Sequence, residues 1–371
     1  LKEDLLKYHY SFYKNAREES SKLKNKAIIF GDNKDRARTI HLAKILNRHE
    51  IEFYHLKQDM NHKGIFYKKE NAFIIPKKQK KSRLINAMFE SRTKFKDSLF
   101  YDVSAWTLPL AYGVESYQLK QGPDSYLGNE LPLVELDGGS VMGGKAQSAY
   151  LMKWNRYYNA RALYKILDAG VLPRLTTEPF SANVNGKKMS FDRGTIVIPV
   201  SQRDANSTQT EDDIHNLMND IALENHVNIY ATNSASTPTG PDLGGAFQGL
   251  LKKPKVAILS GRGTSSYGVG EVWHLLNHRM HIPASLVDAN NLSQRKLSHY
   301  NTLILTDGNY TMLDSADIQS IKDWNKEGGT LITTGSASKW AVNKKITSEK
   351  IKKNKQINLD IAYSRVRNTT G

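Results

Sequence analysis

The chain has 371 residues, of which 39% are hydrophobic and 24% charged, a globular composition with material for two or three domain cores. It contains no cysteine, which excludes disulfide frameworks, thiolate zinc sites, iron–sulfur clusters and a cysteine nucleophile. No window approaches the roughly 20 uninterrupted apolar residues of a membrane helix, so we expect no membrane span. The first residue is Leu1, with no initiator Met or apolar leader, and we expect the chain to be part of a longer protein.

The net charge of +16 is distributed unevenly. Residues 1–116 carry +10, 117–253 carry −1 and 254–371 carry +7, and most of the excess lies in two runs, 63–96 and 339–355. A basic run can bind nucleic acid, but aromatic residues that would stack on bases are not interleaved with these lysines. We therefore interpret the runs as solvated faces and expect no specific nucleic-acid partner.

Buried strands alternate with helices in the first part of the chain. The apolar run 27–31 predicts a strand, and Asp35 is placed to cap a helix whose apolar residues recur at helical spacing. The rest of this unit is predicted as strands at 52–56, 73–76 and 99–103, with a helix at 84–89.

The same order recurs twice. From residue 150 we predict strands at 150–154, 194–199 and 228–232, a helix at 160–169 and an acid-rich helix start at 210–213. From residue 255 we predict strands at 255–259, 284–287, 302–305 and 330–333, with helices at 270–280 and 316–326. Alternating strands and helices are typical of parallel sheets. We therefore predict an α/β fold of three tandem doubly wound, flavodoxin-like parallel-sheet units.

The predicted domains follow from these repeats. They are an N-terminal helical lead-in (1–24), a first α/β unit (25–116), a second α/β unit with a Gly-rich linker (117–253) and a third, shortened α/β unit (254–371). Segments 122–144 and 234–251 are predicted linkers. A Ser-Ala pair follows the closing strand of each unit, so we expect Ser104, Ser234 and Ser336 to lie at equivalent strand ends.

Ligands of open parallel sheets bind at the carboxyl ends of the strands. The loop that begins at Gly261 follows one strand and enters a helix, so its N–H groups could bind an anion. It lacks the spacing of a dinucleotide or phosphate loop, and a polar turn without a ligand is the alternative. The candidates for binding a peptide or small molecule are Gly261, Gly263, Thr264, Glu271, Asp307 and Asn309.

One predicted helix carries a possible metal site. Glu271, His274 and His278 share a helix face, because positions i, i+3 and i+7 align, and such a face could hold a divalent metal. A hydrogen-bonded pair beside a surface imidazole is the commoner outcome of this pattern. In either case we expect Leu275, Leu276 and Met280 on the core side.

Ser336 is the candidate nucleophile. It lies where a strand-to-helix turn would expose a serine beside a helix N-terminus, but its surroundings do not match Gly-x-Ser-x-Gly. The histidines of the same unit all precede it, on elements that lead away from the strand ends or lie at their amino edge. We therefore expect Ser336 to cap the following helix rather than to react.

Longer stretches of the sequence resemble a known family. They are DVSAWTLPLAYG (102–113), within a match that begins at residue 95, KPKVAILSG (253–261), SYGVGEVWHLL (266–276) and GGTLI (328–332). Together they resemble the region downstream of the catalytic domain in large bacterial zinc carboxypeptidase-like proteins, of the carboxypeptidase A-like metallopeptidase family. That region is similar in fold to class I glutamine amidotransferases. The resemblance extends from about residue 25 to residue 345.

The resemblance implies a function without catalysis in this chain. Carboxypeptidase A-like enzymes bind zinc with a His-x-x-Glu pair and a later His. In this chain that spacing occurs at His49 and Glu52, outside the stretches that carry the resemblance, and amidotransferase chemistry needs an absent cysteine. The expected role is a catalytically silent scaffold or binding region of a periplasmic or secreted protein. Its partner is an upstream peptidase domain of the same polypeptide, which holds the zinc, and no cofactor is expected here. The alternative is an independent α/β hydrolase or amidotransferase-like enzyme that uses Ser336 or a metal at His274 and His278.

Overall fold

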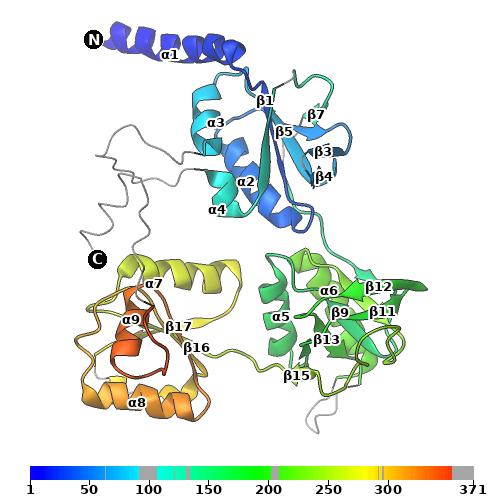
Figure 1. Cartoon of the computed structure of the whole chain (residues 1–371), viewed down its shortest axis with the longest axis vertical. Coiled ribbons are helices and arrows are strands. Elements are labelled where there is room, and N and C mark those ends of the chain that lie inside the picture. Colours follow the sequence, from blue (N-terminus) through cyan, green and yellow to red (C-terminus); the bar gives the residue numbers. More distant parts are fainter. Residues whose placement is uncertain are drawn as a thin grey trace. The chain divides into compact units, whose positions relative to one another are not determined.

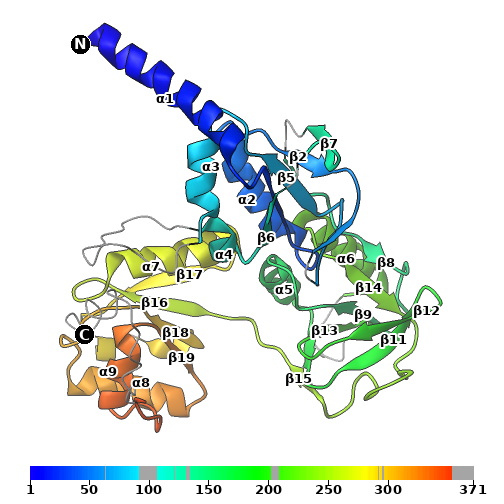
Figure 2. The same cartoon turned by 45° about the horizontal axis from the view of Figure 1, so that its top comes forward.

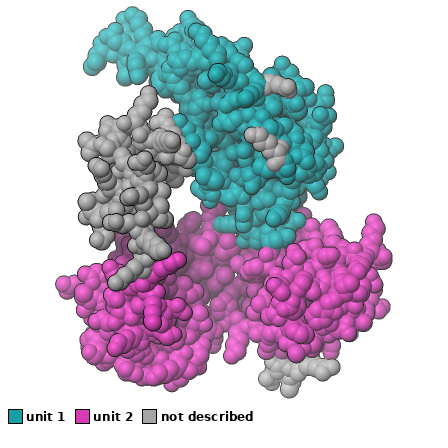
Figure 3. All heavy atoms as spheres, viewed as in Figure 1, with its two compact units in different colours: residues 1–137, 155–157, 357–371 teal, residues 138–154, 158–356 magenta. Residues whose placement is uncertain are grey.

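A computed structural model describes residues 1–62, 64–91, 107–120, 122–130, 134–201, 209–290, 292–294 and 296–352. These residues form two compact units, coloured separately in Figure 3. Unit 1 contains residues 1–137 and 155–157, and unit 2 contains residues 138–154 and the described residues from 158 onward. The finer domain boundaries expected at residues 116 and 253 remain predictions. The predicted strand 99–103 and Ser104 lie outside the described residues.

Unit 1 is built on an antiparallel sheet with strand order β6-β1-β5-β2-β7. Its core contains Ile28, Phe30, Phe73 and Ile75, on which the helices pack. The elements of unit 1 are α1 (Lys2–Lys22), β1 (Ala27–Gly31), α2 (Arg36–Arg48), β2 (Tyr54–Leu56), β3 (Met60–His62), β4 (Ile65–Tyr67), β5 (Ala72–Pro76), α3 (Ser82–Phe89), α4 (Leu108–Tyr112), β6 (Glu115–Leu119) and β7 (Leu127–Glu130) (Figure 1).

The first two helices of unit 1 differ in how they are anchored. Asp35 caps α2 as predicted, and its carboxylate accepts a hydrogen bond from the N–H of Ala37. Helix α1 packs through its C-terminal half, where Ala16 and Ser20 are buried. The N-terminal half of α1 projects from the body of unit 1 in both views (Figures 1 and 2).

The first part of unit 2 repeats this topology. Its sheet has the order β15-β10-β13-β9-β14-β8, antiparallel except for the pair β14 and β8. The elements are β8 (Val141–Met142), β9 (Ala149–Met152), α5 (Asn159–Asp168), β10 (Arg174–Thr176), β11 (Phe180–Val184), β12 (Lys187–Phe191), β13 (Ile196–Pro199), α6 (Glu211–Asn225), β14 (Ile229–Thr232) and β15 (Gln248–Leu250). The predicted acid-rich start of α6 is confirmed as a capping box between Thr210 and Asp213.

These two sheets correct the predicted parallel arrangement. In each, a strand-helix-strand unit is followed by a small hairpin (β3–β4 or β11–β12), and the next strand inserts between the first two. Thus β5 lies antiparallel between β1 and β2, and β13 lies antiparallel between β9 and β10. This is a split β-α-β arrangement. The predicted linkers 122–144 and 234–251 contribute its edge strands β7, β8 and β15.

The last part of unit 2 contains a four-stranded parallel sheet of order β17-β16-β18-β19. Helix α7 lies on one face, and α8 and α9 lie on the other (Figures 1 and 2). The elements are β16 (Val256–Ser260), α7 (Ser266–Trp273), a π-helical turn (His274–Arg279), β17 (Ala284–Asp288), β18 (Thr302–Leu305), α8 (Ser315–Lys326), β19 (Thr330–Thr333) and α9 (Ser336–Asn343). The parallel sheet expected here is present.

The two Ser-Ala turns that the structure describes are therefore not equivalent. Ser234 follows β14, an inner strand of a mainly antiparallel sheet, whereas Ser336 follows β19 at the edge of the parallel sheet. The hydroxyl of Ser234 bonds locally, with Ser236. The expected equivalence is therefore wrong for Ser234 and Ser336, because their strands belong to different kinds of sheet and have different neighbours, whereas Ser104 lies outside the described residues.

Candidate functional site

Most of the predicted ligand-binding residues meet at the carboxyl ends of β16 and β18, the two central strands of the parallel sheet. The loop after β16 carries Gly261, Gly263 and Thr264, and the loop after β18 carries Asp307 and Asn309. The N–H of Asn309 donates to the carbonyl of Gly263 at 2.7 Å. The two loops thus form one hydrogen-bonded structure, as the parallel-sheet prediction required.

Two glycines allow this close approach. Gly263 has φ +86°, and a methyl group on it would lie 2.4 Å from the carbonyl oxygen of Asn309. Gly335 has φ +58°, and a methyl group there would lie 2.7 Å from Oδ1 of Asp307. Both conformations are strained for residues with a side chain, so glycine at these positions is required by the packing of the loops.

Ser336 is tied to the loop after β18. Its N–H donates to Oδ1 of Asp307 at 2.8 Å, and its hydroxyl lies within hydrogen-bonding distance of the same oxygen and of the Gly308 carbonyl. The hydroxyl also accepts from the N–H of Gly308 at 2.9 Å. The N-cap of α9 is Gly335 and Ser336 is its first helical residue. The expected capping role is therefore wrong, because the hydroxyl bonds a neighbouring strand end instead of its own helix.

Asp307 is electrostatically suited to hold this contact. The hydrogen bonds from Ser336 lower the pKa of Asp307, because they stabilise the charged carboxylate. A carboxylate with a lowered pKa is a weak proton acceptor. Asp307 thus positions Ser336 but is poorly suited to activate it as a nucleophile.

The same loops have little capacity left for an anion. The N–H of Thr264 donates to Gly261 and that of Ser265 donates to the carbonyl of Asp307. The side chain of Asn309 accepts from the N–H of Thr311. The exposed carboxylate of Asp307 would also repel an anionic group. This geometry favours the polar-turn alternative over an anion-binding loop.

The three candidate metal ligands lie on α7 and the turn that follows it. The rings of His274 and His278 are adjacent, with centroids 5.4 Å apart, and the side chain of Glu271 is exposed. Among the residues that the structure describes, no three His, Asp or Glu side chains are grouped so that they could hold a metal.

A π-helical turn explains a further correction. Residues 274–279 are π-helical, which shifts the side-chain positions away from the 3.6-residue spacing assumed above. Met280 is buried as expected, but Leu275 is 44% exposed. The prediction that Leu275 faces the core is wrong.

Two further residues, which were not predicted from the sequence, support these loops. Gly335 is one, and the Thr-Gly-Ser turn around it was an available signal for a positive φ. Tyr310 is the other: its buried hydroxyl donates to the carbonyl of Thr306 at 2.6 Å and supports the loop after β18. Burial raises the pKa of Tyr310 to about 12, so it remains a neutral donor.

Comparisons of the chain with protein-family models, with curated proteins and with solved structures give no match. In the part of the chain that the structure describes, no helix combines the length and the hydrophobicity needed to cross a membrane. The site is therefore interpreted from its own geometry.

Proposed function

We propose that this chain is a catalytically silent scaffold or binding region of a larger zinc carboxypeptidase-like protein, with the peptidase domain upstream in the same polypeptide. The sequence resemblance of residues 253–276 and 328–332 supports the family. The zinc belongs to the peptidase domain, and no residue of this chain is assigned to it. A periplasmic or secreted location is part of the same proposal.

One observation supports a role without catalysis. The hydroxyl of Ser336, the candidate nucleophile, is held by Asp307 and Gly308. A reactive serine needs a base that takes its proton. His274 lies eight residues beyond the start of α7 at Ser266, which is roughly 12 Å along the helix axis at 1.5 Å per residue. These contacts and this separation support the silent role over the hydrolase alternative.

The last part of unit 2 is the candidate for a doubly wound, glutamine amidotransferase-like unit. Its strand order corresponds to second-first-third-fourth along the chain, the order of the flavodoxin-like class of doubly wound sheets. Helices on both faces agree with this class. Because ligands of such folds bind at the strand ends, the loops of Gly263 and Asp307 are the place to look for a peptide or small molecule.

Two experiments test the proposal. The natural reading frame upstream of the codon for Leu1 should encode a His-x-x-Glu pair and a later His; an upstream region of unrelated composition would contradict the family. The purified chain should hold no stoichiometric zinc after dialysis and should leave C-terminal peptide bonds intact. One zinc per chain together with peptide cleavage would overturn the silent role.

A further inference from the structure

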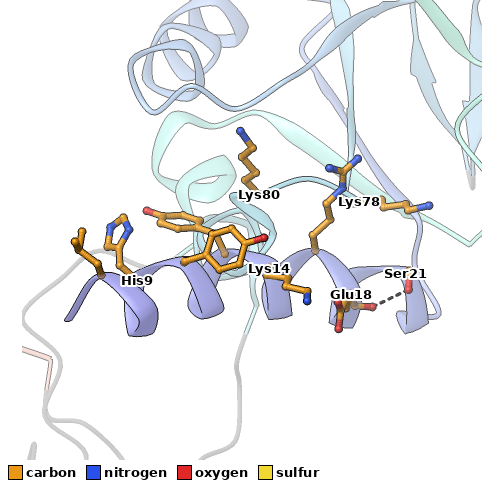
Figure 4. Close-up of a pocket in the computed structure, with 10 residues that line it drawn as sticks. His9, Lys14, Glu18, Ser21, Lys78 and Lys80 are labelled. Atoms are coloured by element: carbon orange, nitrogen blue, oxygen red, sulfur yellow. Dashed lines mark hydrogen bonds between the residues drawn. The ribbon is translucent and has the colours of Figure 1, made fainter. Parts of the chain in front are cut away.

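A groove of about 790 Å³ runs along one face of α1 in unit 1 (Figure 4). On the helix it is lined at positions such as Leu6, Tyr10, Tyr13 and Arg17. These recur every three or four residues and share one face. From residue 6 to residue 21 this face is roughly 22 Å long at 1.5 Å per residue. The groove can therefore hold a segment of several residues.

The helix that forms the groove is firmly attached at one end. The hydroxyl of Ser82 on α3 donates to the carbonyl of Ala16 at 2.8 Å. Arg83 makes two hydrogen bonds with the carboxylate of Glu19, at 2.7 and 3.1 Å, and stacks its guanidinium on the ring of Phe12. Ser82 and Arg83 thus attach the C-terminal half of α1 to α3.

The opposite wall is a loop between β5 and α3 that presents two lysines. Lys77 and Gln79 are only 5% and 4% exposed. The side chain of Gln79 donates to the carbonyl of Glu52 and accepts from its N–H. This alternation leaves Lys78 and Lys80 exposed and lining the groove. Figure 4 shows them across from the stretch of α1 that carries Lys14 and Ser21.

The two ends of the groove differ in chemistry: one is apolar and the other is basic. Its N-terminal end has apolar surface, since Leu6 is 62% and Tyr10 71% exposed. Its other end carries the cations Lys14, Arg17, Lys78 and Lys80 against the one acidic lining residue, Glu18. Within the described residues, none of these four cations forms an ion pair with a carboxylate. Folding brings Lys78 and Lys80 to the aromatic and basic residues of α1, from which they are far apart in the sequence.

We infer that this groove binds an acidic peptide segment whose aliphatic or aromatic side chains pack on Leu6 and Tyr10, while its carboxylates pair with Lys78 and Lys80. The charge of the groove selects an anionic partner. A nucleic acid carries a phosphate at every nucleotide, whereas the cations here occupy one half of the groove. An amphipathic peptide matches both halves. This inference does not depend on the proposed peptidase partner.

The test measures fluorescence anisotropy of labelled probes with the full chain. The main probe is a twelve-residue peptide with leucines in its first half and glutamates in its second. The comparison probes are a shuffled peptide of the same composition and a twelve-nucleotide oligothymidylate. We expect the ordered peptide to bind at least tenfold more tightly than either. Equal binding of all three, tighter binding of the oligothymidylate, or no binding of the peptide would overturn the inference.

Two pairs of variants locate the site. Lys78→Glu with Lys80→Glu should weaken binding of the ordered peptide at least tenfold. The matched control is Lys68→Glu with Lys69→Glu, which makes the same charge change at exposed positions after β4 and should alter binding less than twofold. Equal weakening by both pairs would show attraction to general basic charge and contradict the inference.

A third variant tests the apolar end. Leu6→Gln with Tyr10→Gln keeps good helix formers at exposed positions and should weaken the ordered peptide at least fivefold, with the circular dichroism of the chain unchanged. If this variant binds the peptide as tightly as the parent chain does, the inference that apolar peptide side chains pack on Leu6 and Tyr10 is wrong.

Discussion

The N–H of Ser336 donates a 2.8 Å hydrogen bond to Oδ1 of Asp307, which joins the first residue of α9 to the loop after β18. The strands that lead to these two residues, β19 and β18, are neighbours in the parallel sheet. The contact therefore joins the ends of two neighbouring strands at the edge of the sheet where ligands of such folds bind. Its energetic and chemical consequences can be measured separately.

Removal of the Ser336 hydroxyl should destabilise unit 2. Ser336→Ala leaves the N–H of Gly308 without its side-chain partner and removes one contact of Asp307. We expect a loss of about 1 kcal/mol in the free energy of unfolding, measured as a lower urea midpoint by tryptophan fluorescence. Ser298→Ala, at an exposed serine before β18, should change stability by less than about 0.5 kcal/mol.

The contribution of Asp307 should depend on pH. Its pKa is lower in the folded chain than in the unfolded chain, so its stabilising effect is present above the unfolded value of about 4 and is lost as pH falls through the folded value. Ser336→Ala should raise the folded pKa of Asp307. The stability difference between the parent chain and this variant should therefore shrink between pH 6 and pH 2.5. A difference that stays constant over this range would contradict the pairing.

A comparison of two glycines tests how tightly Gly335 packs on Asp307. Gly335 and Gly328 both have positive φ, but a methyl group at Gly335 would meet Asp307 at 2.7 Å, whereas at Gly328 nothing lies within 4 Å. Gly335 also has ψ −131°, a backbone region that residues with a side chain rarely adopt, so its expected loss combines backbone strain with the contact to Asp307. Gly335→Ala should lose about 1–3 kcal/mol more than Gly328→Ala, as measured by urea unfolding. Equal losses would show that the loop has room to move.

Gln79 should stabilise unit 1 through the loop that carries the groove lysines. Gln79→Ala removes the two hydrogen bonds that the buried Gln79 side chain makes with the N–H and carbonyl of Glu52, and two such hydrogen bonds together contribute about 1–3 kcal/mol. We expect a loss in that range in the free energy of unfolding of unit 1. Lys80→Ala, on the exposed side of the same loop, should change it by less than about 0.5 kcal/mol. Equal effects of the two variants would contradict the anchoring role of Gln79.

Sequence periodicity predicted the elements better than their pairing. The caps at Asp35 and Thr210 were predictable because capping is a local interaction. The direction of β5 was not, because a buried apolar run does not specify which strands it pairs with or in which sense. The small hairpin β3–β4, whose short strands carry a weak apolar pattern, lets β5 insert antiparallel between β1 and β2.

The candidate sites show the same limit. The contact between Gly263 and Asn309 was predictable, because the carboxyl ends of neighbouring parallel strands lie at the same edge of the sheet. The Ser336–Asp307 contact joins residues 29 positions apart, and helix rules applied to Ser336 alone predicted a cap instead. The groove could not be predicted, because Tyr10 and Lys78 are far apart in the sequence and line one groove only when α1 packs on α3.

The most direct test of the silent role is the reactivity of Ser336 in the native chain. The folded protein is incubated with a fluorophosphonate probe, and its intact mass is measured, with peptide mapping of any adduct. Because Asp307 and Gly308 hold the Ser336 hydroxyl, we predict no adduct in the parent chain or in His274→Ala. Stoichiometric labelling at Ser336 that His274→Ala abolishes would contradict the account and establish a serine hydrolase.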